Sequence, residues 1–278
     1  MPPAMLTETA YAKINLALHI RARRTDGYHA LESLFAFCAD GDELRGEARD
    51  DSALTLTVTG PFAEGLSAGE NNLVLRAACA LQAASGTHRG ADLYLDKQLP
   101  VASGIGGGSA DAAAALRLLI RLWGIRPMDM DFPAIAASLG ADVPVCLNSQ
   151  TSFGMGVGDQ LAAVDLDLGG TPILLVNPLL PCPTGPVYAG WGGVDRGPLD
   201  PLLWREGRND LAASATALVP EIDDVLAVLR AQLPELTRMS GSGATCFALF
   251  ASEAERDAAA DRIADDHPDW WGMATVLR

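Results

Sequence analysis

Apolar and polar residues alternate from Ala10 to Ile20, which is the pattern of a β-strand with one buried face. Lys13 and Asn15 fall on the polar face, so the strand points both side chains in the same direction. Thr25-Asp26-Gly27 then predicts a turn. The apolar face of this strand consists of Ala10, Ala12, Ile14, Leu16, Leu18 and Ile20.

Similar patterns predict further strands and helices along the chain. Short strands are expected at 54–59, around Leu93 and Leu95, at 173–176, at 245–250 and near 274–277. Helices are expected from Asn71 or Asn72 to about Ala84, from the N-cap Ser109 to Trp123, at 134–139, twice within 210–233, and from Glu253. These elements do not alternate as in a doubly wound sheet, so we predict an α+β fold of two layers meeting in a cleft.

The clearest local pattern is a glycine-rich loop between a strand and an alanine-rich helix. The loop reads Gly104-Ile105-Gly106-Gly107-Gly108-Ser109; Ser109 suits the N-cap of the helix, and Asp111 suits its first turn. Small residues let the backbone approach a phosphate, and the N–H groups of a helix N-terminus carry partial positive charge. The loop therefore predicts phosphate binding.

Two common phosphate-binding loops do not fit this segment. A P-loop, GxxxxGK[ST], needs a lysine where this chain has Ser109-Ala110. The dinucleotide pattern GxGxxG lacks its third glycine, and the acids about 20 residues further on, Asp129 and Asp131, do not end a strand. A P-loop NTPase and a Rossmann oxidoreductase are therefore disfavoured.

The net charge limits the kinds of partner that the chain can bind. The 35 acidic and 20 basic residues among 278 give a formal charge of −15. Such a charge argues against nonspecific nucleic-acid binding and against adhesion to an acidic membrane surface. It also repels nucleotides, so binding of an anion has to come from local backbone dipoles and a few well-placed cations.

Composition and cysteine spacing indicate a protein that folds without disulfides or structural metals. Hydrophobic residues make up 49% of the chain, which is enough for a full core. The five cysteines form no CxxC pair, so most are expected to be buried apolar residues. The N-terminal segment MPPAMLTETAYAK lacks the features of a signal peptide, and no apolar run is long enough to span a membrane. A cytoplasmic location follows as the expectation.

Several short motifs, in order along nearly the whole chain, resemble one family. The loop PVASGIGGGSADAAA resembles the nucleotide loop of the GHMP kinases, the superfamily of galactokinase, homoserine kinase, mevalonate kinase and phosphomevalonate kinase. Five further segments are similar to the diphosphocytidyl-methylerythritol kinases of that superfamily: AKINL at 12–16, DGYHAL at 26–31, GADVPV at 140–145, NDL at 209–211 and SGSGATCFALF at 240–250.

The resemblance implies roles for particular residues. Asp142 would be the catalytic base, and Lys13 would stabilise the charge of the transferring phosphoryl group. Substrate would be bound by Asn15, Tyr28, His29, Thr184 and Tyr188, with the cytidine pocket at Tyr28-His29. ATP would be bound by Pro100, Val101, Ala102, Ser103, Gly104, Ile105, Gly106, Gly107, Gly108, Ser109 and Ala110.

The resemblance also implies a fold and a reaction. It implies a two-domain α+β kinase with its active site in the inter-domain cleft, an N-terminal domain at 1–158 and a C-terminal domain at 159–278. ATP and Mg²⁺ are the expected cofactors, and a small molecule, rather than nucleic acid or membrane, is the expected partner. Two alternatives stay open: a GHMP kinase acting on another alcohol, and a nucleotide-binding protein without catalysis.

Overall fold

The computed structural model describes residues 5–278 and contains two compact units. One unit comprises residues up to 12 together with 40–101 and 107–148; the other comprises 13–39, 102–106 and 149–278. Both units combine helices with strands, which confirms the α+β class. The ranges differ from the predicted 1–158 and 159–278, because the long strands β1 (Leu6–Arg23) and β2 (His29–Arg49) contribute residues to both units. The predicted domain assignment stays a prediction.

The first strand, β1, is buried more fully than its alternation predicted. From Lys13 to Ile20 both faces are buried, so the expectation of one wet face was wrong. Other backbone segments pair with the edge of β1: Lys13 N–H donates to the carbonyl of Ile105, and the backbone of Leu18 pairs with Arg208 and Asp210. On the polar face, Asn15 donates to Ser33. A strand whose two faces are both covered needs polar partners for its polar side chains.

Strand β2 was not predicted, and its composition explains why. Its residues 34–38 are continuously apolar and buried, so the strand lacks the alternation that marks a half-buried strand. Gly41 interrupts the pattern further. A Cβ at that position would collide with the backbone of Ala10, so only glycine lets β2 pass so close to β1.

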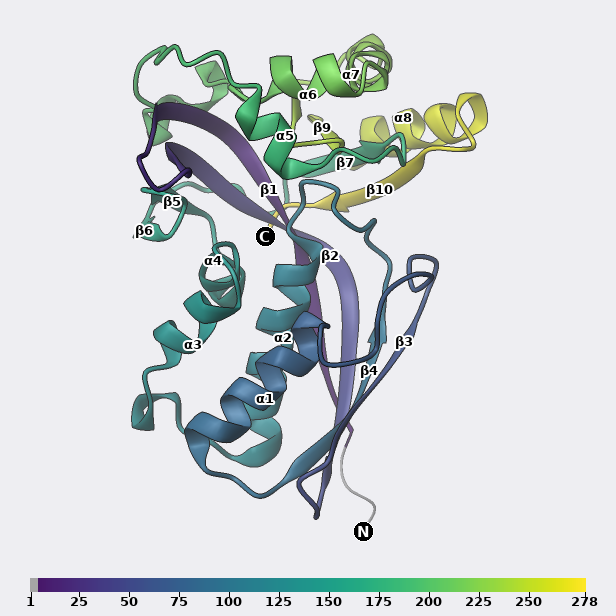
Figure 1. Cartoon of the computed structure of the whole chain (residues 1–278). Coiled ribbons are helices and arrows are strands. Elements are labelled where there is room, and N and C mark those ends of the chain that lie inside the picture. The colour runs from purple at the N-terminus through teal and green to yellow at the C-terminus, as the bar shows by residue number, and fades with distance from the viewer. Residues whose placement is uncertain (1–4) are drawn as a thin grey trace. The chain divides into compact units, whose positions relative to one another are not determined.

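The unit that includes residues 40–101 is a sheet with helices on one face (Figure 1). Strand β4 (Gly90–Asp96) pairs antiparallel with β2 and parallel with β3 (Leu54–Thr59). Helices α1 (Leu73–Ser85) and α2 (Gly107–Trp123) pack side by side. They are followed by η1 (Pro127–Asp129), α3 (Phe132–Leu139) and α4 (Val143–Asn148). Helix α4 was not predicted.

The helix ends in this unit partly follow the predicted capping. Asn72 caps α1 by accepting from the N–H of Val74, and Gly86 ends the helix in the left-handed region at φ 66°, as expected. Helix α2 already begins at Gly107, so Ser109 is its third residue and not its N-cap. Asp111 is its fifth residue and lies beyond the first turn. Because glycine has a low helix propensity, the predicted start of this helix was too late in the sequence.

The other unit contains a hairpin and a four-stranded antiparallel sheet. In the hairpin, β5 (Ser152–Met155) pairs with β2 and with β6 (Gln160–Ala163). The sheet has the order β10 (Trp271–Val276), β7 (Pro172–Asn177), β9 (Cys246–Leu249) and β8 (Leu236–Met239). Its helical elements are α5 (Thr184–Ala189), η2 (Pro201–Glu206), α6 (Ala212–Leu218), α7 (Glu221–Ala231) and α8 (Glu253–Asp266).

The core of this second unit lies where α7 and α8 pack on the sheet. All five cysteines of the chain are free thiols; four are buried as expected, and Cys79 is exposed. Within residues 5–278, no helix has the length and apolar character needed to cross a bilayer. The segment examined for a signal peptide begins with four residues that lie outside the described part of the chain.

Candidate functional site

Strand β1 places Lys13 and Asn15 in a buried hydrogen-bonded chain. Lys13 Nζ donates to Asn15 Oδ1 over 3.2 Å, and Asn15 Nδ2 donates to Ser33 Oγ over 2.7 Å. Ser33 in turn donates to the carbonyl of Ala17, which fixes the orientation of the Asn15 amide. The ammonium of Lys13 also lies 5.0 Å from the centre of the Phe35 ring. The predicted pair therefore lies on one face of the strand, held by residues of β2.

The first half of the glycine-rich loop packs directly on the backbone of the SGSG loop at 240–243. Ser240 Oγ donates to the carbonyl of Gly104 and accepts from the N–H of Asn15. A Cβ on Gly104 would lie 2.6 Å from the Ser240 carbonyl oxygen, and its φ of 79° disfavours any other residue. A Cβ on Gly106 would meet the side chain of Lys13 at 3.1 Å. Glycine is required here for close packing.

The SGSG loop has its own supports. Asn209 Nδ2 donates to the carbonyls of Met239 and Gly241, so the NDL segment holds the loop in place. Thr184 lies at the start of α5, with its Oγ1 3.0 Å from Ser242 Oγ. Thr184, predicted to bind substrate, is thereby brought to the same loop that contacts Asn15 and Gly104.

The second half of the glycine-rich loop forms the start of α2. Gly107, Gly108 and Ser109 are its first three residues, and the N–H groups of this first turn have no partner within the helix. These donors and the helix dipole form an anion-binding end. The structure therefore places the predicted phosphate-binding glycines where the backbone provides positive potential.

A buried charge cluster, absent from the sequence predictions, lies against this helix start. Lys97 Nζ donates to Asp42 Oδ2 over 2.5 Å and to Asp111 Oδ2 over 2.7 Å. Asp42 Oδ1 also accepts from the backbone N–H groups of Gln98 and Leu99. Burial disfavours the charged lysine, but Asp111 and Asp42 outweigh this effect and raise the pKa of Lys97.

Asp142 lies in the unit that contains α2, at the junction of α3 and α4. Its carbonyl accepts from the N–H of Cys146 as α4 begins, and Gly140 ends α3 before it. Arg117 of α2 ties α4 down, because its Nη1 donates to the carbonyl of Cys146 over 2.9 Å. Asp142, the predicted base, therefore lies in the short turn between α3 and α4, and Arg117 holds α4 in place.

His29 and Tyr188 meet in an aromatic cluster with Trp191. The ring centres of His29 and Tyr188 are 5.3 Å apart, and Trp191 contacts His29 edge-on at 5.7 Å. Arg23 donates from Nε to His29 Nε2 over 3.3 Å, and its Nη2 is anchored by the carbonyls of Ala189 and Trp191. This cluster joins the predicted residues His29 and Tyr188 with two residues that were not predicted.

The arginine determines the protonation state of the histidine. An arginine can only donate, so His29 Nε2 must accept, and a neutral ring then carries its proton on Nδ1. Burial, followed by the charge of Arg23, lowers the pKa of His29. The aromatic cluster therefore contains a neutral imidazole that offers an N–H donor. Tyr28, the third predicted aromatic residue, has its side chain largely in solvent, at 62% exposure.

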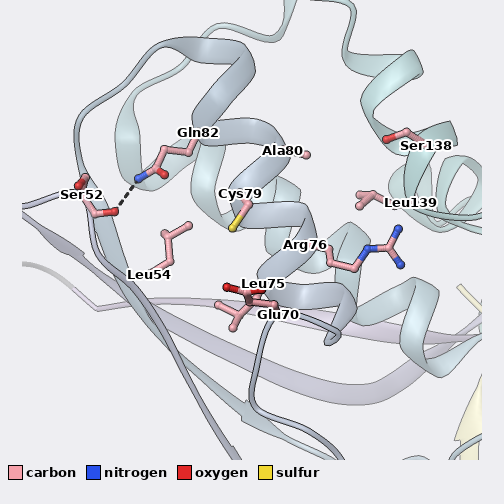
Figure 2. Close-up of a pocket in the computed structure, with 10 residues that line it drawn as sticks. All are labelled: Ser52, Leu54, Glu70, Leu75, Arg76, Cys79, Ala80, Gln82, Ser138 and Leu139. Carbon is pink, nitrogen blue, oxygen red and sulfur yellow. Dashed lines mark hydrogen bonds between the residues drawn. The ribbon is translucent and has the colours of Figure 1, made fainter.

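The structure also contains a pocket away from every predicted site residue. It has a volume of about 620 Å³ and lies on α1, with Leu54 of β3 on one side and Leu139 of α3 on the other (Figure 2). Gln82 at its edge donates to the carbonyl of Ser52. None of the loop residues from Pro100 to Ala110 lines this pocket.

Several residues that support the site were not predicted from the sequence. One of them lies in a segment whose motif had been noticed. The resemblance placed the SGSG segment at 240–243 near the nucleotide or substrate phosphates, which stays a prediction; its Ser240 was not singled out. Ser33, Arg23, Lys97 and Asp42 gave no local signal, because their partners are brought together only by pairing of distant segments.

Comparisons with known proteins point to one family. Residues 72–150 match the GHMP kinases N terminal domain, and residues 196–269 match the GHMP kinases C terminal domain. Over 280 residues the chain is 54% identical to a 4-diphosphocytidyl-2-C-methyl-D-erythritol kinase of Rhizorhabdus wittichii, covering 98% of this chain and 94% of that protein. It is 51% identical over 283 residues to the protein of the same name from Sphingopyxis alaskensis, covering 99% of both.

Solved structures agree with the sequence comparisons. A crystal structure of 4-(cytidine 5'-diphospho)-2C-methyl-D-erythritol kinase superposes with a TM-score of 0.85 at 34% identity, covering 98% of this chain and 99% of that one. Homoserine kinase from Cytophaga hutchinsonii matches with a TM-score of 0.72 at 17% identity, covering 98% and 95%. The second likeness concerns the fold alone.

Proposed function

This chain belongs to the GHMP kinases, within the family of 4-diphosphocytidyl-2-C-methyl-D-erythritol kinases, and from this premise we propose how its residues perform the reaction. The enzyme transfers a phosphoryl group from ATP to the 2-hydroxyl of 4-diphosphocytidyl-2-C-methyl-D-erythritol, a step of the non-mevalonate isoprenoid route. The observation that carries this conclusion is identity above 50% with kinases of that name over almost the entire chain.

We propose Asp142 as the base that accepts the proton of the substrate hydroxyl. Phosphoryl transfer depends on in-line placement and on stabilisation of charge more than on covalent chemistry by the protein. Asp142 is supported for this role by its fixed position before α4, which Arg117 holds to α2. Lys13 would stabilise the negative charge of the transferring group, and its bond to Asn15 orients the ammonium.

The loop from Pro100 to Ala110 would bind the triphosphate of ATP. The proposal is supported by the N–H groups at the start of α2 and by the glycines that leave no side chain over this backbone. An acidic protein can bind an anion here because backbone dipoles, rather than a basic surface, provide the attraction. Ser103, which is buried, would serve by shaping the loop through its carbonyl bond to Thr245 N–H.

Mg²⁺ would enter with the nucleotide. Within the described part of the chain no group of three His, Cys, Asp or Glu side chains is arranged to hold a metal. Asp42 and Asp111, the carboxylates at the start of α2, are both engaged by Lys97. The donor set thus fits an ion bound mainly through phosphate oxygens, as is common for Mg²⁺. Bound in this way, Mg²⁺ would neutralise charge on the phosphates.

The cytidine end of the substrate would bind at the aromatic cluster. Tyr28 and Tyr188 would stack on the base, which is worth about 1–3 kcal/mol per base in other proteins. The Nδ1–H of His29 would donate to an acceptor on the edge of the base, since Arg23 occupies Nε2. A site built around such a hydrogen bond rejects analogues that present a donor at the same position. Asn15 and Thr184 would contact the rest of the substrate.

A cytoplasmic location accords with a small-molecule substrate and stays a proposal.

One assay tests the proposed substrate. ADP release is measured with the cytidyl substrate, its uridyl analogue, homoserine and mevalonate. We expect turnover of the cytidyl compound, with the uridyl analogue at least about tenfold poorer in kcat/KM, the range for loss of one recognised polar group. Turnover of homoserine or mevalonate alone would favour a different alcohol kinase. ATP binding without turnover of any acceptor would favour a protein that has lost catalysis.

A further inference from the structure

We propose that Asp111 positions the phosphate loop as the protonated member of a buried cluster with Lys97 and Asp42, and that loss of this proton weakens ATP binding. The inference rests on the proposed role of the loop in binding ATP. All three side chains lie in the unit that contains α2, and their exposed fractions are 3% for Lys97, 0% for Asp42 and 6% for Asp111.

The cluster contacts both ends of the loop. Asp42 accepts from the backbone of Gln98 over 2.6 Å and of Leu99 over 2.8 Å, where the chain leaves β4. At the other end, a Cβ on Gly107 would lie 3.1 Å from Lys97 Nζ and 3.8 Å from Asp42 Oδ2. The cluster therefore ties the segment that enters the loop to the helix that leaves it.

The charges of the cluster do not balance if both acids are ionised. Two carboxylates then share the single ammonium of Lys97 in the protein interior, and one negative charge remains uncompensated. An uncompensated buried charge is costly, and a buried carboxyl group avoids the cost by taking up a proton. One of the two acids is therefore expected to be neutral.

Hydrogen bonding identifies Asp111 as the neutral acid. Asp42 accepts from three N–H donors, which favour a carboxylate. Asp111 accepts only from Lys97, and its Oδ1 is buried with no hydrogen-bond partner in the described structure. A proton would turn this oxygen into a donor, and Asp42 would be its acceptor.

The electrostatic surroundings of Asp111 agree with this assignment. Burial is the largest cause that raises the pKa of Asp111 to about 8; Lys97 opposes it, and the charge and hydrogen bonding of Asp42 add to it. The helices packed on α2 bury apolar side chains and the thiol of Cys146. Strand β1 brings two titratable groups to α2, Glu8 and Tyr11, and both contact Arg117. Arg117, on α2 itself, is directed to Glu8 and to the carbonyls of Thr9 and Cys146.

The proton on Asp111 affects how strongly the start of α2 attracts ATP. With Asp111 neutral, Lys97 and Asp42 cancel, and the partial positive charge at the start of α2 is unopposed. With Asp111 ionised, a full negative charge lies behind the N–H groups that would hold phosphate. Binding of ATP should then weaken as the pH rises through the pKa of Asp111.

Calorimetric titration with ATP across about pH 6.5 to 9.5 tests this linkage. The wild-type protein should lose ATP affinity by about fivefold or more over that range, as expected for one poorly screened charge. Asp111→Asn, which mimics the neutral acid, should show no loss of ATP affinity as the pH rises. Asp42→Asn should bind poorly at every pH, because the amide keeps only one acceptor oxygen for Gln98 and Leu99 and removes the carboxylate that pairs with Lys97. Asp96→Asn, a neighbouring acid outside the cluster, should behave like wild type.

Infrared spectroscopy tests the proton itself without ATP. The wild-type protein near neutral pH should show a protonated-carboxyl band that disappears on titration and is missing from Asp111→Asn. Absence of this band from wild type, or its persistence in Asp111→Asn, would overturn the proposal. So would parallel loss of ATP affinity in wild type and Asp111→Asn, or equal behaviour of the two Asn variants. A confirmed band with no linkage to ATP would instead show that the loop is not the phosphate site.

Discussion

Lys13 is only 4% exposed, and its position on β1 depends on polar neighbours. A buried ammonium needs hydrogen-bond acceptors, and Asn15 provides one at 3.2 Å. Asn15 is itself oriented by Ser33 and by its backbone bond to Ser240. At the scale of single residues, the proposed catalytic lysine is therefore preorganised, which favours stabilisation of a transition state over mere binding of the ground state.

Lys13→Met and Asp142→Asn should each lower kcat by about 10²–10⁴-fold, the range for loss of a charge stabiliser or a general base. ATP affinity should change far less, because the loop backbone is proposed to carry it. Steady-state kinetics with calorimetric ATP binding would check both statements. Asp129→Asn, an exposed acid paired with Arg126, serves as the control. Near-normal turnover in either test variant would show that the residue has another role.

His29 provides the second prediction at this scale. Burial and Arg23 lower its pKa below the ordinary 6.5, so the neutral ring is favoured in the folded protein. Its contribution to stability is therefore present above pH 6.5 and is lost as the pH falls through the lowered value. Arg23→Met removes one of the two causes and should move the pKa of His29 upward. As the pH is lowered, kcat/KM of this variant should therefore begin to decline at a higher pH than kcat/KM of the wild type.

NMR titration of the His29 ring in wild type and Arg23→Met measures this shift directly. Arg24→Met is the matched control, because Arg24 pairs with the exposed Asp26 and makes no bond to His29. Identical His29 titration curves in wild type and Arg23→Met would contradict the assigned contact.

The glycine-rich loop is the element where packing and proposed binding coincide. Its first half packs against Ser240 and Gly243, and its second half begins α2. Ala102 has a φ of 52°, a conformation that costs energy for a residue with a side chain. The loop is thus held by contacts that outweigh local strain, which is a common property of functional segments.

Gly107→Val should raise the KM for ATP by at least about tenfold while the protein stays folded, since a branched side chain hinders approach to this backbone. The structure adds a second reason, because a Cβ there would press on Lys97 Nζ. Circular dichroism and thermal unfolding would verify the fold. Gly169→Val is the control, since a Cβ at that exposed turn has only an ordinary contact at 3.8 Å. An unchanged KM in a folded Gly107→Val protein would exclude this loop from the phosphate site.

The whole molecule carries a formal charge of −15, yet it uses an anionic nucleotide. The attraction has to be local, and the surrounding field opposes the approach of ATP.

Raising the ionic strength from a low value to about 0.15 M, where the Debye length is about 8 Å, should lower the KM for ATP. Salt screens the long-range repulsion more than the short contacts at the loop. Initial rates at several salt concentrations would measure this effect. Inhibition by uncharged adenosine should change little and is the control. A KM that increases with salt would mean that an exposed basic patch, rather than backbone dipoles, attracts the nucleotide.

Much of the fold followed from local sequence, because the signals were local. The strand at 54–59 and the helix between Asn72 and Gly86 match β3 and α1, since alternation and capping act over a few residues. The long strand β2 was missed, because its apolar run resembles a buried helix as much as a strand. The start of α2 was predicted at Ser109, because Gly107 and Gly108 have a low helix propensity and did not indicate a helical turn.

The sequence by itself determined the family and pointed to the proposed phosphate loop and to the candidate residues Lys13 and Asp142, since their motifs are contiguous segments. Only the tertiary structure showed that Ser240 contacts Asn15, that Arg23 fixes the tautomer of His29, and that two acids share Lys97. These contacts join residues far apart in the chain, as with Asn15 and Ser240, which are 225 positions apart. Pairing over such distances depends on packing of the whole unit, whereas a motif needs only its immediate neighbours.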